Sequence, residues 1–559
     1  MPRIDAQPTQ PPPDLPRASN VTGAAPAPHV PLSSAFRAVF SVTLLSRIGG
    51  LARDVIIARV FQDSAINSAF QFAFAIPNMF RRLFGEGALS AAFLPEYTAQ
   101  LKADPDAAHR LASLMLAALG LFTGIATLLG ELLLLALLLL LPPNPERELS
   151  IRLTMVMLPF MPLICTVAIL SGMLQVHGRF AASASGPLVL NAFIIGVGLW
   201  ALATGRILDQ RVAYTFAIAT TLSGATQAFW FARLLRPHAR WTRHCAAALP
   251  AARTVFRRFM PVLVGLGALQ LGALLDQLIA MWPIWVGPTI LGVAYPLDDA
   301  SVAILAASQR LYQFPLGVFG IAVATAVFPT LSRHAADPAA FVDTLRRGIR
   351  LSLLLALPAS LGLVLVSTDL THVLYAADPA RNVPGFSADG VARAAAVLAG
   401  YAPAIWAFTL NHVLARGFYA HADTITPMRI ALVLVLINLA GNLLLIWPLR
   451  EAGLAWSSAL SGTLQTACLY FFLRRLPGGA AFDRATTFAV VRLVAAALVM
   501  AAGVATLLGL FPAPASWSAH LLRLILSCLL GSALFISVCL ALGAPEIAWI
   551  LRPARAERR

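Results

Sequence analysis

Charged residues are scarce in this chain of 559 residues, and lysine is almost absent. Asp, Glu, Lys and Arg together make up 12% of the sequence, hydrophobic residues make up 59%, and the mean hydropathy is +0.78. Lys102 is the only lysine. Soluble globular domains carry about 25% charged residues. This composition therefore excludes an ordinary soluble protein and predicts a chain that resides in a lipid bilayer.

Sequence patterns for disulfides, metal sites and catalysis are missing as well. The five cysteines form no CxxC pair and show no metal-type spacing with histidine, so most are predicted to be small buried residues. No P-loop, GxSxG, HExxH or paired-carboxylate motif accompanies the charged residues. We therefore expect a protein that is not an enzyme, with no cofactor and no firmly bound metal.

Apolar runs recur along the chain, and several are long enough to cross a membrane. Examples are residues 111–141, 430–447 and 524–542. A helix needs about 20 residues to cross a hydrocarbon core about 30 Å thick. Only helices and closed β-barrels satisfy their backbone groups in lipid, and these runs are too long for barrel strands. The sequence therefore predicts an all-α polytopic membrane protein.

Fourteen segments of this kind follow one another along the chain. They cover residues 35–60, 64–97, 111–141, 151–175, 184–204, 212–235, 255–281, 299–329, 345–367, 391–419, 427–448, 452–473, 486–510 and 519–543. Residues 1–34 are rich in proline and alanine and contain no apolar segment of the signal-peptide type. They are predicted to form a disordered cytoplasmic tail.

The distribution of arginine predicts how the chain is inserted. The formal net charge is +16, and arginines concentrate in the connections 233–258, 333–350 and 474–484 and in the tail 552–559, whereas 282–298 contains no Lys or Arg. Cytoplasmic connections carry an excess of basic residues, so both termini are predicted to be cytoplasmic. The same rule, with contacts to anionic membrane lipids, explains the positive charge better than nucleic-acid binding does.

An internal repeat divides the chain. Residues 84–95 resemble 319–329, and residues 179–191 resemble 418–438 with looser spacing. Both pairs are six predicted spans apart, and an even offset predicts parallel copies. The predicted organisation is an N-lobe at 35–240 (helices 1–6), a C-lobe at 241–480 (helices 7–12), an extra helix pair at 481–545 and a basic cytoplasmic tail at 546–559.

Charged residues inside the first predicted span are candidates for function, because arginine in hydrocarbon costs about 2.5–3.5 kcal/mol. Gly49 and Gly50 lie in the middle of this span and favour a kink. Arg47 and Asp54 are seven residues apart on one helical face, so one interpretation is a pair that neutralises itself. Arg53 has no acid at i±3 or i±4 and still needs a counter-charge.

The second span carries two adjacent arginines. Arg82 and Glu86 stand at i and i+4 and can form a structural pair. Arg81 points about 100° away from Arg82 and has no acid at i±3 or i±4, so we interpret it as available to an external anion. The alternative is that both arginines reach to the cytoplasmic interface.

The eighth span supplies a third arginine from the other lobe. Arg310 is flanked by Gln309 and Gln313. The planar guanidinium group binds two phosphate oxygens at once. Arg53, Arg81 and Arg310 together therefore predict a binding site for a pyrophosphate group.

A second set of polar residues predicts a cation site. Asp276 lies in the seventh span, Asn438 and Asn442 lie one helical turn apart in the eleventh, and Ser458 lies in the twelfth. Oxygen ligands on adjoining helices suit Na⁺, and a buried carboxylate suits a proton. The alternative is that the amides only join helices and that Asp276 lies at the outer interface.

Four stretches of this sequence resemble a known family. Residues 46–54, 77–95, 310–315 with 328–329, and 415–427 closely resemble the MurJ (MviN) lipid II flippases of bacteria, and the likeness extends from about residue 35 to 545. These proteins belong to the MOP exporter superfamily. The resemblance implies fourteen helices in two six-helix lobes, with the last helix pair forming a groove for an undecaprenyl tail.

The resemblance also implies which residues bind the substrate. Carried over by motif position, they are Arg47, Arg53, Asp54, Arg81 and Arg310. The chain departs from the family pattern at three positions where acids are usual, namely Ser68, Gln309 and Gln313. These departures predict a more positive site. Asn442 replaces an aspartate found in some members, which weakens the case for sodium.

The resulting hypothesis is a monomeric lipid II flippase of the bacterial cytoplasmic (inner) membrane. It would move the undecaprenyl-pyrophosphate-linked peptidoglycan precursor from the inner to the outer leaflet by alternating access, with possible coupling to Na⁺ or H⁺. The alternative is a MOP-type exporter of another lipid-linked oligosaccharide or of an amphipathic drug. A drug carrying positive charge would call for acids in the site, whereas a non-transporting scaffold would need no arginines in mid-membrane.

Overall fold

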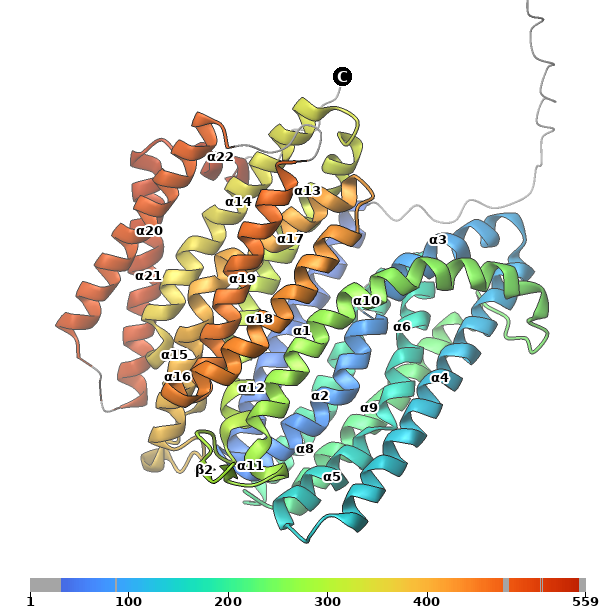
Figure 1. The fold of residues 1–559 in the computed structure, drawn as a ribbon, viewed down its shortest axis with the longest axis horizontal. Helices are drawn as coiled ribbons and strands as arrows, with labels where there is room; N and C mark the ends of the chain where they lie inside the picture. The colour runs from blue at the N-terminus through green and yellow to red at the C-terminus, as the bar shows by residue number, and fades with distance from the viewer. Residues whose placement is uncertain (1–31, 86–87, 476–481, 513, 515, 552–559) are drawn as a thin grey trace, which may run out of the picture.

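The computed structural model describes residues 32–85, 88–475, 482–512, 514 and 516–551, and these residues are mostly helical. Long helices run roughly parallel in two groups, with α10 between them and α20 and α21 on the outer edge of the second group (Figure 1). We call the end of the bundle that carries α22 the α22 end. The opposite end, which carries the two short strands, is the hairpin end.

The first group, the N-lobe, contains nine helices among the described residues. They are α1 (Leu32–Phe61), α2 (Ala65–Gly85), α3 (Ala88–Ala103), α4 (Pro105–Leu140), α5 (Pro145–Met157), α6 (Phe160–Val176), α7 (Phe180–Ala184), α8 (Gly186–Ala203) and α9 (Gln210–Leu235). Side-chain caps start several of them. Asp104 accepts a hydrogen bond from the Asp106 amide at the start of α4, where Pro105 occupies the first helical position, a combination that favours helix initiation.

The second group, the C-lobe, begins with α10. Its elements are η1 (Ala246–Ala248), α10 (Leu249–Ala280), α11 (Trp282–Trp285), β1 (Thr289–Ile290), β2 (Val293–Ala294), α12 (Ser301–Pro315), a π-helical segment (Leu316–Gly320), α13 (Ile321–Arg333), α14 (Pro338–Leu365), α15 (Ser367–Tyr375), η3 (Pro379–Arg381), α16 (Ala388–Tyr401), η4 (Ala402–Ala404), α17 (Ile405–Ala420), α18 (Ile425–Leu449) and α19 (Glu451–Leu473). The chain continues with α20 (Arg484–Leu510), α21 (Trp517–Ala541) and α22 (Glu546–Leu551).

The polytopic all-α prediction is confirmed, and helix lies along each predicted segment. Some segments are divided: 64–97 contains α2 and α3, and 151–175 contains α5 and α6, which meet at Pro159. Eight helical stretches in the described part of the chain are long and apolar enough to cross a membrane, so the number fourteen stays a prediction. Most of the predicted N-terminal tail, residues 1–31, lies outside the described residues, as do 552–559 of the basic tail.

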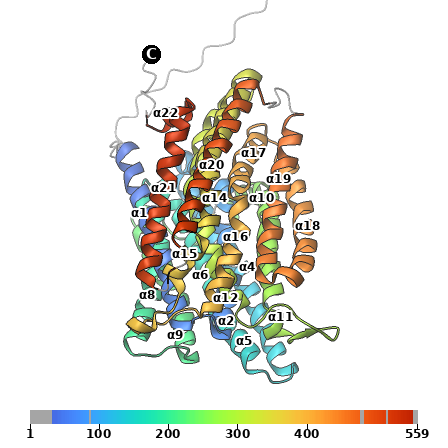
Figure 2. The same ribbon diagram turned by 90° about the vertical axis from the view of Figure 1, so that its left-hand side faces the viewer.

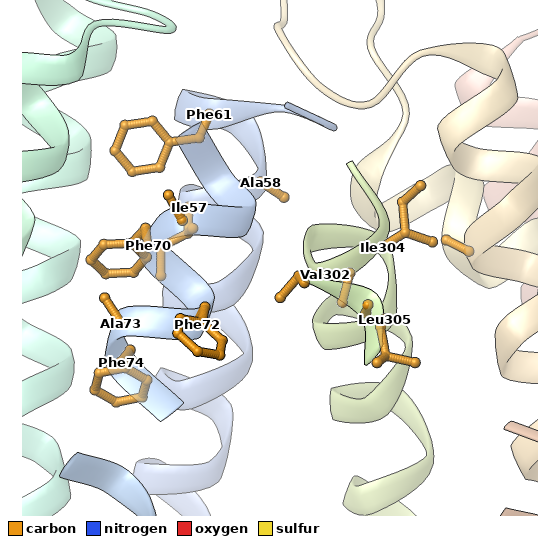
Figure 3. Packing of buried hydrophobic residues seen from close by; sticks show 14 of the residues in the cluster. Ile57, Ala58, Phe61, Phe70, Phe72, Ala73, Phe74, Val302, Ile304 and Leu305 are labelled. Atoms are coloured by element: carbon orange, nitrogen blue, oxygen red, sulfur yellow. The ribbon is translucent and has the colours of Figure 1, made fainter. Parts of the chain in front are cut away.

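The two lobes share a hydrophobic core at the hairpin end. One cluster of buried residues joins the end of α1 and the start of α2 to α12 and α16. Ala58 of α1 and Val302 of α12 point into the space between their helices, whereas Phe61 and Phe70 point into the N-lobe (Figure 3). Burial of apolar surface is the main favourable term in packing, so this cluster holds the lobes together.

Towards the α22 end the hydrophobic cores are separate. One cluster joins the N-lobe helices α2, α3, α4, α6 and α9 to the start of α10. Another joins α13, α14 and α17 to α18–α21 within the C-lobe. The lobes therefore share one core at the hairpin end. Towards the α22 end, α10 is the C-lobe helix that packs in the N-lobe core, and the other C-lobe helices named here form a core of their own.

Candidate anion-binding site between the lobes

The predicted substrate residues Arg53, Asp54 and Arg310 form a compact ion cluster. Arg53 is buried, and its Nε and Nη2 lie 2.9 and 2.8 Å from Asp54 Oδ1. Arg310 Nε lies 3.1 Å from the other carboxylate oxygen of Asp54. Arg53 and Asp54 come from α1 of the N-lobe and Arg310 comes from α12 of the C-lobe, so a single carboxylate joins two arginines across the boundary between the lobes.

The prediction that Arg53 and Arg310 lack a counter-charge in the protein is therefore wrong. It considered only acids three or four residues away on the same helix. Arg53 has a side chain long enough to reach its direct neighbour, and Arg310 meets Asp54 only through the packing of the two lobes. The predicted neutralisation of Arg47 by Asp54 is wrong for the same reason, since Asp54 binds the two other arginines.

Asn191 of α8 positions Arg53 and was missed as a site residue. Its Oδ1 accepts a hydrogen bond from Arg53 Nη1 (3.2 Å), and its Nδ2 donates to the carbonyl of Ser46 (3.1 Å). A Cβ atom added at Gly49 would lie 3.2 Å from that Nδ2, so the glycine permits close approach. Only the repeat match between Asn191 and Asn438 hinted at this role.

Arg47 and Arg81 complete the positive surroundings. Arg47 Nη2 donates to the carbonyl of Gly317 in the π-helical segment of the C-lobe (3.3 Å). Arg81 Nε donates to Asn78 Oδ1 one turn earlier on α2 (2.9 Å), and its availability to an external anion stays a prediction. The charges of Arg81 and Arg310 both act on Arg53.

The cluster carries an excess of positive charge. Arg53 and Arg310 supply two positive charges and Asp54 supplies one negative charge, which leaves a formal charge of +1. Arg310 keeps 29% of its side chain exposed, so part of its guanidinium group is accessible. An anion that binds several guanidinium groups can therefore be held here by charge-assisted hydrogen bonds.

Other predicted residues have different surroundings. Glu86 lies outside the described residues, so the Arg82–Glu86 pair stays a prediction.

Ser68 is fully buried, and its Oγ accepts a hydrogen bond from the Ala303 amide at the start of α12 (3.1 Å). It therefore belongs to the contact between the lobes, and its effect on the charge of the anion site stays a prediction. Gln309 donates to the hydroxyl of Tyr401 (3.1 Å).

The predicted cation-site residues come together in the C-lobe. Asn442 Nδ2 donates to Asp276 Oδ1 (2.5 Å), and Asn438 Nδ2 lies 3.3 Å from Ser458 Oγ. Asp276 and Asn442 are buried, and Asn442 Oδ1 has no hydrogen-bond partner among the described residues. Amide hydrogen bonds between helices are present, as the alternative interpretation expected, and Asp276 lies near the end of α10, so its position at the outer interface stays an alternative.

Polar contacts reinforce the closure at the hairpin end. Arg59, in the last turn of α1, donates to the carbonyls of Ala376 and Pro384 in the loop before α16 (2.5 and 2.9 Å). Asp63 Oδ1 accepts from the amide of Ser387 (2.9 Å), the residue that caps α16. Together with the shared core, these contacts close this end of the boundary between the lobes.

An apolar pocket lies in the C-lobe beside α20. It has a volume of about 450 Å³, and its walls come from α14, α17, α19 and α20, with Leu353, Leu410 and Val494 among the lining residues. The resemblance implied a groove formed by the last helix pair. This pocket involves only the first helix of that pair, since no residue of α21 lines it.

Comparison with known proteins identifies the family. The family model for the lipid II flippase MurJ matches residues 57–554. This chain belongs to the MurJ family. A probable lipid II flippase MurJ of Vibrio cholerae is 30% identical over 90% of this chain and 95% of its own length. The lipid II flippase MurJ of Burkholderia cenocepacia is 29% identical over 83% of this chain and 89% of its own length.

Solved structures support the fold. A lipid II flippase MurJ in an inward closed conformation superposes with a TM-score of 0.72 at 19% identity, over 92% of this chain and 99% of that one. A multidrug resistance MATE transporter of the MOP superfamily, in an inward-facing conformation, gives a TM-score of 0.59 at 11% identity, over 78% and 97% of the two chains. The MurJ family fold thus shares its architecture with MOP transporters.

Proposed function

We propose that this protein is a transporter that flips lipid II between the leaflets of the bacterial inner membrane, acting as a monomer. The observation that carries the proposal is the ion cluster of Arg53, Asp54 and Arg310, which lies between the lobes and retains excess positive charge. A pyrophosphate group offers several oxygens to such a cluster. The named activity of the MurJ relatives supports the same substrate.

The two ends of the bundle support alternating access. The hairpin end is closed by a shared core and by Arg59 and Asp63, whereas towards the α22 end the hydrophobic clusters of the two lobes are linked only through α10 among the described residues. In this state the substrate enters from the α22 end and its pyrophosphate displaces Asp54 from Arg310. Arg310 then binds the pyrophosphate in place of Asp54. The ion pair between the lobes is lost, and the lobes can rearrange.

The orientation follows from charge. We infer that the α22 end, which carries the arginine-rich connections, faces the cytoplasm, so that both termini are cytoplasmic. Reporter fusions after residues 240 and 340 should then read cytoplasmic, and a fusion after residue 290 should read periplasmic. The opposite readings would reverse the direction of transport proposed here.

Arg310 provides the direct test. Loss of one charge-assisted contact costs about 1.5–3 kcal/mol, or roughly a ten- to hundredfold loss of affinity. We expect Arg310→Ala to fail to complement a depletion strain and to leave lipid II on the cytoplasmic leaflet at normal protein abundance. Arg310→Lys should rescue partly, because lysine keeps the charge and loses the planar fork.

Arg110→Ala is the matched control for Arg310→Ala. Arg110 is similarly exposed (33% against 29%) and forms an ion pair of the same length with Asp104, far from the anion site at the start of α4. Normal growth with Arg310→Ala would refute the pyrophosphate site. Accumulation of a different lipid-linked precursor would instead support the alternative exporter, and accumulation of none would support a drug exporter.

A cation-coupling role for the C-lobe cluster is a second proposal. It is supported by the buried carboxylate of Asp276 and by the unpartnered Oδ1 of Asn442, which provide hard oxygen ligands. Na⁺ should raise the thermal unfolding midpoint of the purified protein more than K⁺ does, and Asp276→Asn should abolish the difference. If Na⁺ and K⁺ act equally on the unmodified protein, and lowering the pH also has no Asp276-dependent effect, this cluster only joins helices.

A further inference from the structure

The tip of the β-hairpin between α11 and α12 combines two unfavourable features. Leu291 and Gly292 both have positive φ (50° and 82°), and Leu291 is 100% exposed. Two-residue turns of this kind prefer Asn, Asp or Gly, because at positive φ the Cβ atom of most other residues lies too close to the following carbonyl oxygen. A fully exposed leucine at positive φ costs conformational free energy and gains no packing within the protein, and such outliers often indicate function.

The surrounding residues are apolar and uncharged. No Asp, Glu, Lys or Arg occurs from residue 282 to residue 297. Val286 and Val293 are 61% and 56% exposed, so the apolar surface extends from the tip along the hairpin. Contiguous exposed apolar surface on a protein indicates a contact with another molecule or with lipid.

The base of the hairpin is fixed to the helix ends. Tyr295 donates its hydroxyl hydrogen to the carbonyl of Ile279 (2.9 Å) and packs against Trp282, with ring centroids 5.7 Å apart. Arg450 Nε donates to the carbonyl of Pro296 (3.1 Å), and its Nη2 lies 2.8 Å from Asp298 Oδ2. The apolar tip is therefore carried by a positioned base and not by an unrestrained loop.

Asp298, in the loop between the hairpin and α12, is a charged group at this base. Burial alone would raise the pKa of Asp298, but the hydrogen bond from Arg393 and the charges of Arg393 and Arg450 hold it below its ordinary value. The hairpin therefore has a polar base, where Asp298 forms ion pairs, and an apolar tip, where Leu291 is exposed. This separation is typical of segments at a membrane interface.

The position of the hairpin indicates lipid as its neighbour. Figure 2 shows the hairpin extending sideways from the bundle near the ends of α10 and α18. On α18, Leu444 and Trp447 are 71% and 45% exposed near the same end, as expected for a lipid-facing helix whose aromatic residues lie at the interface. Trp447 also contacts Tyr295, with ring centroids 6.4 Å apart, so the interfacial aromatic residues continue into the hairpin.

We propose that this hairpin inserts its tip, with Leu291 and Val293, into the interfacial region of the lipid leaflet at the hairpin end and anchors the C-lobe there. The occupant of the surface is phospholipid. Since α10 and α18 also carry Asp276 and Asn442, the anchor holds the two helices of the candidate cation site at a fixed depth. The proposal requires a bilayer next to the hairpin but does not require lipid II as the substrate.

Depth-dependent fluorescence quenching tests the proposal. In a variant without the five native cysteines, Leu291→Cys is labelled with an environment-sensitive fluorophore, and the full chain is reconstituted in phosphatidylethanolamine–phosphatidylglycerol vesicles. Asn382→Cys is the matched control, because Asn382 is exposed at the same end and also has positive φ (53°) in a polar loop. Both labelled proteins are first checked for monodisperse behaviour in detergent.

We expect the label at residue 291 to emit at shorter wavelength, to be quenched by lipids with a shallow doxyl group and to be shielded at least fivefold from iodide relative to residue 382. Iodide quenching equal to that at residue 382 would overturn the proposal. Shielding without quenching by doxyl lipid, especially if it varies with the protein-to-lipid ratio, would assign the surface to a second copy of the chain and overturn it as well. None of these outcomes depends on lipid II transport.

Discussion

The two lobes use the same arrangement to hold charges of opposite sign. In the N-lobe, Asn191 on the helix of the fifth span meets Arg53 on the first helix and accepts its hydrogen bond. In the C-lobe, Asn442 on the helix of the eleventh span meets Asp276 on α10 and donates to it. An amide carries both a donor and an acceptor, so one residue type serves a cation in one lobe and an anion in the other.

The two charge clusters differ in their position relative to the lobes. The N-lobe cluster contains several arginines around one carboxylate and shares its boundary with the C-lobe through Arg310. The C-lobe cluster contains one buried carboxylate and lies within a single lobe. An anion bound at the first cluster, as proposed above, would therefore act on the contact between the lobes, whereas a cation bound at the second would act on the packing of α10 against α18 and α19.

The largest expected difference is in stability. Asp54→Asn leaves the buried Arg53 beside Arg310 without a carboxylate, and breaking such a buried pair costs about 3–5 kcal/mol. Asp276→Asn replaces a carboxylate that has only an amide partner, and we expect a change below about 1 kcal/mol. Thermal unfolding of both variants in detergent, with membrane abundance in cells, measures the contrast. Equal losses in the two variants would contradict the assignment of Asp54 as the shared counter-charge.

Exchanging amide for carboxylate sharpens the comparison. Asn191→Asp keeps an acceptor for Arg53 and should fold normally. Asn442→Asp places a second carboxylate beside Asp276, and the repulsion should lower stability by about 1–3 kcal/mol, as for a buried group left unpaired. Unfolding midpoints in NaCl and KCl provide the measurement, since Na⁺ should restore the second variant only. If the unfolding midpoints of Asn191→Asp and Asn442→Asp respond alike to NaCl and KCl, the two lobes do not bind ions of opposite charge.

The smallest expected effect concerns the closed end. Asp63→Ala removes an acceptor at the start of α16 in the other lobe, a loss of about 1 kcal/mol, which corresponds to about a fivefold shift in a conformational equilibrium. Val302 is buried in the shared core. A thiol reagent should therefore label Val302→Cys about five times faster when Asp63→Ala is also present. Asp337→Ala is the control, because Asp337 caps α14 within one lobe. If Asp63→Ala and Asp337→Ala accelerate labelling equally, the effect is a general loss of stability and not an opening between the lobes.

Local sequence determined much of the architecture. The length of the apolar runs fixed helix as the only possible structure in lipid, because a backbone inside a bilayer must satisfy its own hydrogen bonds. Motif positions also selected Arg53, Asp54 and Arg310 as neighbours in one site, and Asp276 with Asn442 in another, and the structure brings each set together. The break at Pro159 within one predicted segment lies where proline removes a donor.

Tertiary structure alone decided which charges are paired. Helical periodicity reports neighbours three or four residues away, so it could show neither the contact of Arg310 with Asp54 across the lobes nor the support of Arg53 by Asn191. The resemblance named Ser68 only as a departure from the family pattern, whereas packing shows that Ser68 of α2 accepts a hydrogen bond from Ala303 at the start of α12. Sequence by itself determined which segments are helices and which residues carry charge. The counter-charge of Arg310 depended on how two lobes, far apart along the chain, pack against each other.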